Sequence, residues 1–296
     1  MSKRRTYWHL EEARRKPSEY EVATSRLLYS VPRGLAVDIP AARWNARYQQ
    51  GSPLACDAWD SFVDPRETTY AKYTELQSAK QIYVEGLLRS IDDAFERSLS
   101  PSWIAVLDRA FAPLRYPVHG LQMVAAYVAQ MAPAGRIVVA SAMQSADEMR
   151  RIQLVAYRMR QLQKRHAGFG DASRERWEKD RAWQPLREVI EKLLVAYDWG
   201  EAFVALNLVV KPAIDELFVK RLGALALSRG DDVLFRLLAS LDEDTAWHRA
   251  WSRALAAVAV SARPENAGVI EGFTGAWTPR VARAIDEAGA MLDEGG

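Results

Sequence analysis

The stretch from Tyr116 to Ala146, YPVHGLQMVAAYVAQMAPAGRIVVASAMQSA, decides the fold, because Arg136 is the one charged residue in its 31 positions. Uncharged segments on both sides of Arg136 are long enough for buried helices, and the Pro-Ala-Gly sequence ending at Gly135 predicts a break between them. The first segment, 20 residues from Tyr116 to Gly135, has the length of a membrane span. Its prolines, histidine and glutamines instead favour a helix buried on all sides within a large helical protein.

Helical periodicity continues outward from this pair in both directions, and strand-like alternation is rare. The sequence therefore predicts an all-α fold, with one helical domain over residues 61–296 that ends in short helices between Val269 and Met291. The segment Asp64 to Glu67 (DPRE) predicts the start of a long helix, because it places an N-cap, a first-turn proline and a capping-box glutamate in order. Pro212 follows another uncharged run and predicts a kink there.

The first 60 residues differ from the rest, because they hold seven of the 21 Tyr and Trp residues together with four prolines. We predict an extended, aromatic-rich N-terminal arm over residues 1–60. Such an arm has little core of its own, so it lies either on this chain's bundle or on a neighbouring subunit. Six aromatic side chains are the predicted subunit contacts: Tyr7, Trp8, Tyr20, Tyr29, Trp44 and Trp59.

The charge balance limits the classes of partner. The 296 residues include 40 Lys and Arg against 38 Asp and Glu, a net charge of +2 that is too small for neutralising many phosphates of a nucleic acid. The single cysteine, Cys56, can form no internal disulfide, and the charged N-terminus lacks the apolar run of a signal peptide. We therefore expect a cytoplasmic protein that binds neither nucleic acid nor membrane.

Few patterns of catalytic residues occur in the sequence. None of the four histidines has a glutamate three positions earlier, so the Glu-x-x-His pairs of ferritin-like di-iron proteins are missing. The nucleophile motif Gly-x-Ser-x-Gly and the glycine-rich phosphate loops are also missing. Glu148 and Arg151 follow an apolar segment, and they either form a buried ion pair or mark where the helix surfaces. A lone histidine such as His248 is more often a satisfied or exposed side chain than a metal ligand.

Six short segments in a fixed order carry a family resemblance: Thr6–Leu10 (TYWHL), Lys16–Glu21 (KPSEYE), Ser52–Leu54 (SPL), Gln130–Pro133 (QMAP), Asp198–Phe203 (DWGEAF) and Asn207–Pro212 (NLVVKP). In this combination the chain resembles, over almost its whole length, the β subunit of bacterial multicomponent monooxygenase hydroxylases. The resemblance is greatest to the branch that oxidises toluene and other aromatics or alkenes, including isoprene. The methane, phenol and propane branches are more distant.

The resemblance implies a ferritin-like, ribonucleotide-reductase-like bundle in an α2β2γ2 hydroxylase, in which α carries a di-iron centre and β is not catalytic. It also implies electron transfer to α from NADH through an FAD reductase and a Rieske [2Fe–2S] ferredoxin, with a small effector protein. Arg151 would stand where α has a histidine and Thr245 where α has a glutamate. The implied degenerate ligand positions are Glu148, Arg151, Glu201, Thr245 and His248.

We therefore predict no metal, cofactor-binding or catalytic residue in this chain. Two other functions are compatible with the residues. One is a ferritin-like oxidase with an unconventional metal site of its own. The other is a helical scaffold without an enzyme partner.

Overall fold

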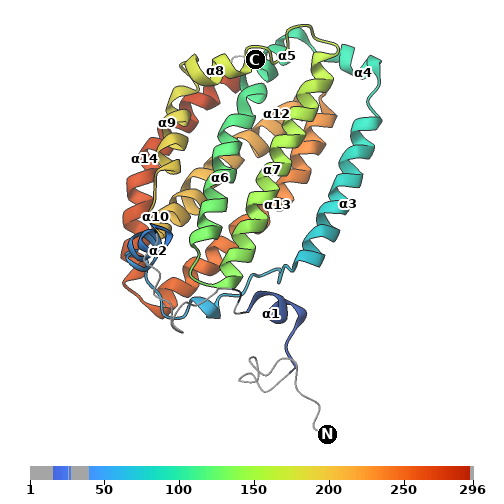
Figure 1. Cartoon of the computed structure of the whole chain (residues 1–296). Coiled ribbons are helices and arrows are strands. Elements are labelled where there is room, and N and C mark those ends of the chain that lie inside the picture. The colour runs from blue at the N-terminus through green and yellow to red at the C-terminus, as the bar shows by residue number, and fades with distance from the viewer. Residues whose placement is uncertain (1–15, 26, 28–39, 294–296) are drawn as a thin grey trace.

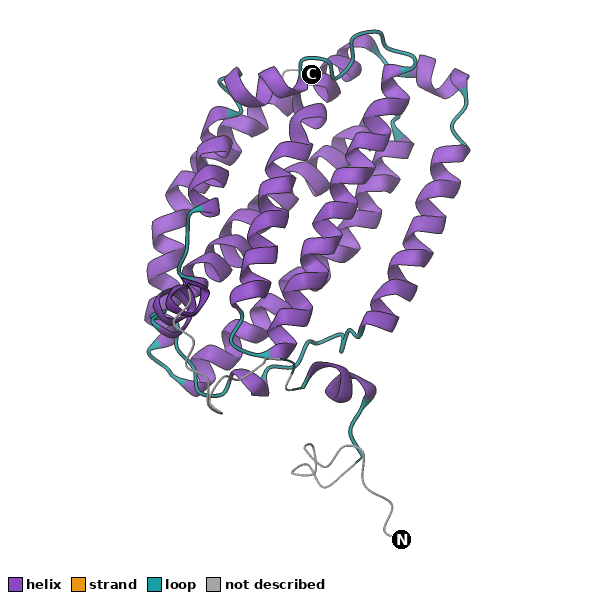
Figure 2. Ribbon diagram, viewed as in Figure 1, coloured by secondary structure: helices purple, strands orange, loops and turns teal. Residues whose placement is uncertain are grey.

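The structure, a computed structural model, describes residues 16–25, 27 and 40–293. Within these ranges the chain consists of helices and loops, which confirms the all-α prediction (Figures 1 and 2). The predicted contact residues Tyr7, Trp8 and Tyr29 lie outside the described ranges.

Two helices pack side by side along the bundle (Figure 1): α6 (Arg115–Met131) and α7 (Gly135–Gln163). The predicted break between them is confirmed, because Ala132 is extended and α7 starts at Gly135. The other elements, in chain order, are α1 (Glu19–Thr24), α2 (Pro40–Asn45), η2 (Ala46–Gln50), η3 (Trp59–Ser61), α3 (Tyr70–Arg89), α4 (Asp93–Ser98), α5 (Pro101–Val106), η4 (Leu107–Phe111), η5 (Ala112–Leu114), α8 (Ser173–Lys179), α9 (Gln184–Leu194), α10 (Trp199–Val204), η6 (Ala205–Val210), α11 (Lys211–Asp215), η7 (Glu216–Arg221), α12 (Leu222–Ser228), α13 (Asp232–Ala262) and α14 (Asn266–Asp293).

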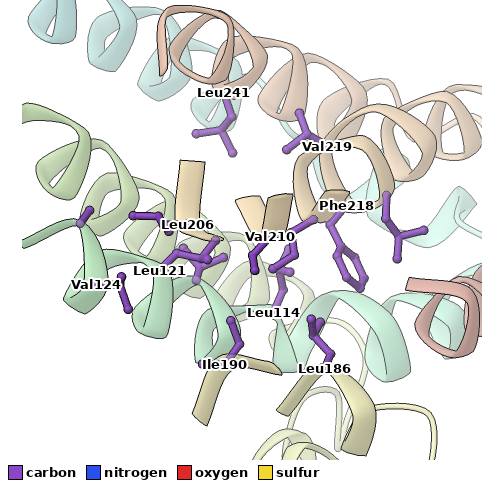
Figure 3. Close-up of a cluster of buried hydrophobic side chains, with 14 of the residues drawn as sticks. Leu114, Leu121, Val124, Leu186, Ile190, Leu206, Val210, Phe218, Val219 and Leu241 are labelled. Carbon is purple, nitrogen blue, oxygen red and sulfur yellow. The ribbon is translucent and has the colours of Figure 1, made fainter. Parts of the chain in front are cut away.

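The segment from α10 to α12 is one helical rod with two π-helical stretches, η6 and η7. Proline lacks the N–H that an α-helix interior needs, and the structure places η6 directly before Lys211 and Pro212. A π-helical stretch therefore stands where the sequence predicts a kink. Figure 3 shows apolar side chains of α6, α9 and this rod meeting in one buried cluster, among them Leu121, Ile190 and Val210.

The prediction that a long helix starts at Asp64 is wrong, because α3 starts at Tyr70 with Thr69 as its N-cap. The Asp64 carboxylate instead accepts hydrogen bonds from the backbone N–H groups of Arg66 and Thr68. It also accepts one from the indole N–H of Trp247 in α13, at 2.8 Å. This contact with the core fixes Asp64 in a tight turn, so the helix does not begin there.

The prediction of short helices between Val269 and Met291 is wrong, because Asn266–Asp293 form one 28-residue helix, α14.

The prediction that the uncharged segment is buried on all sides is also wrong. One side of α6 and the adjoining side of α7 are exposed, and no exposed position of either helix up to Tyr157 carries Asp, Glu, Lys or Arg. We call this surface the uncharged face, and its residues are His119, Met123, Ala126, Gln130, Ala142, Ala146, Met149, Gln153, Ala156 and Tyr157. No helix in the described part of the chain is long and apolar enough to cross a membrane.

Gly120 allows α6 to approach α9 closely. A Cβ atom at this position would lie 2.3 Å from Cγ2 of Ile190, a branched side chain that is 3% exposed. Because neighbouring side chains fill the surrounding core, Ile190 cannot move away without disturbing other contacts.

We expect Gly120→Ala to lower the free energy of unfolding by about 1–3 kcal/mol through overpacking. The control is Gly86→Ala in α3, where an added Cβ has no neighbour within 4 Å. That substitution should raise the free energy of unfolding by about 0.5–1 kcal/mol through helix propensity. Urea denaturation checks both values, and equal effects would contradict the described packing of α6 on α9.

Candidate functional site

A cluster of charged side chains lies at the centre of the bundle. It contains Glu148 from α7, Lys211 and Asp215 from α11, and His248 from α13, and none of these residues is more than 3% exposed. With Arg151 of α7, which is 2% exposed, these residues form what we call the central cluster. Ionisable groups are this deeply buried only when other groups compensate their charge.

The Lys211 ammonium joins two helices. Nζ lies 2.7 Å from Oε1 of Glu148 and 2.7 Å from Oδ2 of Asp215. The sequence prediction assigned no role to Lys211 or Asp215, although a lysine and an aspartate four residues apart lie on the same helix face. The uncharged run that precedes Lys211 is the feature of the sequence that could have indicated a buried ion pair.

The two alternatives for Glu148 and Arg151 are now distinguished, because both side chains are buried. Nη1 of Arg151 lies 3.7 Å from Oε2 of Glu148, so the two groups form an ion pair within α7. A closer contact, 2.7 Å, joins the same nitrogen to Oδ1 of Asp215. Arg151 therefore connects α7 to α11, as Lys211 does.

Lys211 and Asp215 are charged despite their burial. Burial disfavours the charged form of Lys211, but the carboxylates of Asp215 and Glu148 outweigh burial and raise its pKa. Burial likewise disfavours the Asp215 carboxylate, and Lys211 and Arg151 outweigh it and lower its pKa. Both groups are therefore charged at neutral pH.

His248 is uncharged in this environment. Burial, with the Lys211 ammonium adding to it, lowers the pKa of His248 to about 3. Its Nε2 lies 2.9 Å from Oδ2 of Asp147, so this nitrogen carries the proton and donates to the carboxylate. Its Nδ1 lies 4.0 Å from Oε1 of Glu148 and has no hydrogen-bond partner among the described residues.

Asp147 connects the central cluster to a second layer of polar groups. Burial raises the pKa of Asp147 to about 6, although the hydrogen bond from the Tyr73 hydroxyl, at 2.8 Å, acts to lower it. Nε2 of Gln77 donates to Oδ1 of Asp147 at 2.8 Å and to Oδ1 of Asp244 at 3.0 Å. Arg150 pairs with Asp244 at 3.1 Å.

The second layer contains the charged residues Lys80, Asp147, Arg150 and Asp244. Together with the central cluster it holds equal numbers of positive and negative charges when every carboxylate is ionised and His248 is neutral. Lys80 of α3 completes the second layer through an ion pair with Asp244. Four carboxylates face four cationic side chains, namely Asp147, Glu148, Asp215 and Asp244 against Lys80, Arg150, Arg151 and Lys211.

The structure places the other two degenerate ligand positions away from these contacts. The Thr245 hydroxyl donates within α13 to Oδ1 of Asp242 at 2.7 Å, and Glu201 accepts from the indole N–H of Trp277 in α14 at 3.0 Å. In the part of the chain that the structure covers, no group of three or more His, Cys, Asp and Glu side chains is arranged to hold a metal ion.

The described residues of the arm lie on this chain's own bundle. Tyr20 is 3% exposed, and its hydroxyl accepts from the backbone N–H of Asp64. The Trp59 ring packs on Trp199, with 5.3 Å between the ring centroids. Trp44 remains 38% exposed, although its indole N–H donates to the hydroxyl of Tyr127 at 3.0 Å.

A groove of about 390 Å³ separates α6 from the end of α9, beside the uncharged face. Met123, Tyr127, Leu194 and Tyr197 are among the side chains that line it. The Trp44 ring packs against Tyr197 with 5.0 Å between the ring centroids, so this part of the arm lies at the edge of the groove.

Comparison with known proteins identifies similar sequences. A sequence profile of the Methane/Phenol/Alkene Hydroxylase family matches residues 44–263. The chain is 41% identical to the β subunit of the hydroxylase component of the toluene-4-monooxygenase system of Ectopseudomonas mendocina, over 97% of this chain and 90% of that protein. It is 25% identical to the small subunit of the propane 2-monooxygenase hydroxylase component of Rhodococcus jostii, over 82% of this chain and 67% of that protein.

Solved structures show the same fold. A chain of toluene 4-monooxygenase with toluene bound in its resting active site superposes with a TM-score of 0.92 at 40% identity, covering 98% of this chain and 97% of that one. A chain of xenon-pressurised phenol hydroxylase from Pseudomonas sp. OX1 superposes with a TM-score of 0.84 at 18% identity, covering 100% of this chain and 92% of that one.

Lys211 and Lys220 each form an ion pair with an acidic residue four positions away, but only Lys211 is buried. Replacing the two lysines should therefore change the free energy of unfolding by very different amounts. Lys211→Met leaves Glu148 and Asp215 without their shared cation, so the free energy of unfolding should fall by about 3–5 kcal/mol. The control is Lys220→Met, because Lys220 pairs with Glu216 at 3.2 Å on the surface. It should change the free energy by less than about 1 kcal/mol. Urea denaturation measures both, and a Lys211→Met effect as small as the control would contradict the described cluster.

Proposed function

Because the chain belongs to the methane, phenol and alkene hydroxylase family, we propose that it is the non-catalytic β subunit of a di-iron monooxygenase hydroxylase. The similarity to a hydroxylase β subunit over 97% of the chain supports this role. The chain would then be part of an oxidoreductase without holding the reacting atoms itself.

The central cluster is the observation that carries the non-catalytic assignment. A ferritin-like di-iron centre uses a glutamate from each of two helices and a Glu-x-x-His pair from each of two others. Here α7 supplies Glu148 without the histidine, and α13 supplies His248 without the glutamate. Lys211 and Arg151 already neutralise the carboxylates that remain. The residues present therefore do not fit a di-iron centre.

The chemistry would take place in a partner α subunit. In this proposal α holds the two irons and inserts an oxygen atom from O2 into an aromatic or alkene hydrocarbon. Toluene is the compound named for the related system of Ectopseudomonas mendocina, which supports the aromatic branch. An FAD reductase and a Rieske [2Fe–2S] ferredoxin would pass electrons from NADH to α, and a small effector protein would act on the assembly. We place this α2β2γ2 assembly in the cytoplasm.

This chain would contribute contact surface and rigidity to the assembly. The interfaces of permanent complexes are more apolar than other surfaces, and charged residues are depleted at their centres. The uncharged face has this composition, and the Trp44 ring lies at one edge of the adjoining groove. We propose that this face and the aromatic arm, with Tyr7, Trp8, Tyr29, Trp44 and Trp59, contact the other subunits, whereas Tyr20 is buried against its own bundle and holds the arm there.

Co-expression with candidate α and γ chains tests the assignment. We expect one assembly that co-purifies through size exclusion, and oxygenation of toluene or an alkene when the reductase, the ferredoxin and NADH are added. Iron should be present in the assembly and missing from this chain when it is purified alone. Stoichiometric iron in the isolated chain would support a ferritin-like oxidase instead, and failure to co-purify would support a scaffold without an enzyme partner.

Met123→Lys tests the uncharged face directly. Met123 is 47% exposed, so the lysine should leave the stability of the isolated chain unchanged within about 0.5 kcal/mol. A charge buried in the interface should weaken binding to the co-expressed α subunit by about tenfold or more. Leu227→Lys, at a 48% exposed site on α12, is the matched control and should leave binding unchanged. Equal binding by the two variants in a titration would exclude Met123 from the interface.

A further inference from the structure

The outer side of α3 points away from the rest of the bundle. On its inner side, Tyr73, Gln77 and Lys80 contact acidic side chains of α7 and α13, and Val84 and Leu88 are buried. These five residues recur every three or four positions, so they share one side of the helix. Figure 1 shows α3 at the edge of the bundle, so its opposite side faces outward.

A regular stripe of exposed residues follows this outer side. We call it the α3 stripe, and its residues are Glu75, Ser78, Ile82, Gly86 and Arg89. The Ile82 side chain is 70% exposed, and a Cβ atom at Gly86 would have no neighbour within 4 Å. The stripe thus has an apolar side chain at its middle, a small residue on each side and a charge at each end. Protein interfaces have the same order, with an apolar centre and a polar rim.

The α3 stripe is complementary to itself. A two-fold axis through Ile82 would place a second α3 antiparallel to the first, and each residue would lie opposite the residue equally far beyond Ile82. Ser78 then faces Gly86 of the second copy, four positions on either side of Ile82, and Glu75 faces Arg89, seven positions on either side. A parallel two-fold pair would instead place Glu75 opposite Glu75 and Arg89 opposite Arg89, and like charges that meet in an interface repel.

The side chains of the stripe suit close contact between two helices. The distance between packed helices depends on the side chains at the contact, so small residues at Ser78 and Gly86 allow the second helix to reach Ile82. Arg89 pairs with Glu85 of its own helix at 2.8 Å, and its side chain is 79% exposed. The guanidinium therefore lies at the surface, where it can also contact a carboxylate of a second copy.

We propose that the α3 stripe binds the α3 stripe of a second copy of this chain, as an antiparallel helix pair centred on Ile82. The α2β2γ2 assembly proposed above contains two copies, so the inference rests on that proposal and names the surface at which the copies meet. The uncharged face on α6 and α7 remains for the α subunit.

Disulfide crosslinking in the co-purified assembly tests the pairing. Ile82→Cys lies on the proposed axis, so oxidation should join the two copies of this chain into a covalent dimer on a non-reducing gel. The matched control is Leu227→Cys on α12, because Leu227 is an exposed apolar side chain on another helix, at 48% exposure. It should give about tenfold less dimer or lower, since its thiols are not held together. Equal crosslinking by the two variants would overturn the proposal.

The register has its own test. Ser78→Cys should crosslink about tenfold less than Ile82→Cys, because Ser78 lies opposite Gly86 and not opposite itself. Combining Ser78→Cys with Gly86→Cys should restore the dimer. If Ser78→Cys alone crosslinks as well as Ile82→Cys, the antiparallel pair centred on Ile82 is wrong.

Charge exchange tests the ends of the stripe, with the crosslinking rate of Ile82→Cys as the readout. Adding Glu75→Arg places two arginines opposite each other and should lower the rate by about tenfold. Adding Arg89→Glu as well restores opposite charges, so the rate should recover. The control is Arg174→Glu, which breaks a similarly exposed arginine pair, with Glu178 on α8, and should leave the rate unchanged. A rate that does not recover would overturn the proposed pairing.

The inference and the proposed function fail in different ways. If this chain co-purifies with α and γ but Ile82→Cys does not crosslink, the pairing is overturned and the subunit assignment stands. If the chain does not co-purify, the subunit assignment fails, and the same crosslinking of the full chain alone decides the pairing.

Discussion

The Lys211 ammonium, 2.7 Å from both Glu148 and Asp215, is the interaction on which the interior of the bundle depends. Each carboxylate lies on a different helix, and neither can be left unpaired in a buried site without a large cost in free energy. Together with Arg151, this contact joins α7 to α11. The hydrogen bond from His248 to Asp147 of α7 joins α13 to the same cluster. The carboxylates at the centre of the protein are thus neutralised by lysine and arginine side chains of the same chain.

The sequence was sufficient for the helical class and for the pair α6 and α7, because the uncharged segments 116–135 and 137–146 mark α6 and the first part of α7 and a proline lies between the two helices. It was also sufficient to show that none of the four histidines has a glutamate three positions earlier. The start of α3 could not be predicted, since Asp64 is held in its turn by Trp247, which is 183 residues away in the chain. The role of Lys211 could not be predicted for a similar reason. Only the folded bundle shows that Glu148, 63 positions earlier, reaches the same ammonium as Asp215.

The exposed stripe along α6 and α7 shows a different limit of sequence analysis. An uncharged helix is expected to be buried, but the sequence does not tell whether its own chain or another subunit covers it. In this chain one side of each helix packs inward and the other side forms the uncharged face. The arm reaches the edge of that face, where Trp44, Tyr127 and Tyr197 are joined by hydrogen bonds and ring contacts. The same segment therefore supplies both the core of this chain and the surface that suits an obligate assembly.

These features together describe a helical subunit whose interior carboxylates are balanced by its own lysine and arginine side chains. Anomalous X-ray diffraction at the iron edge, from crystals of the co-purified assembly, tests this account most directly. The account predicts anomalous density for iron within the partner subunit and none between Glu148, Asp215 and His248 of this chain. An iron peak between these three side chains would contradict it.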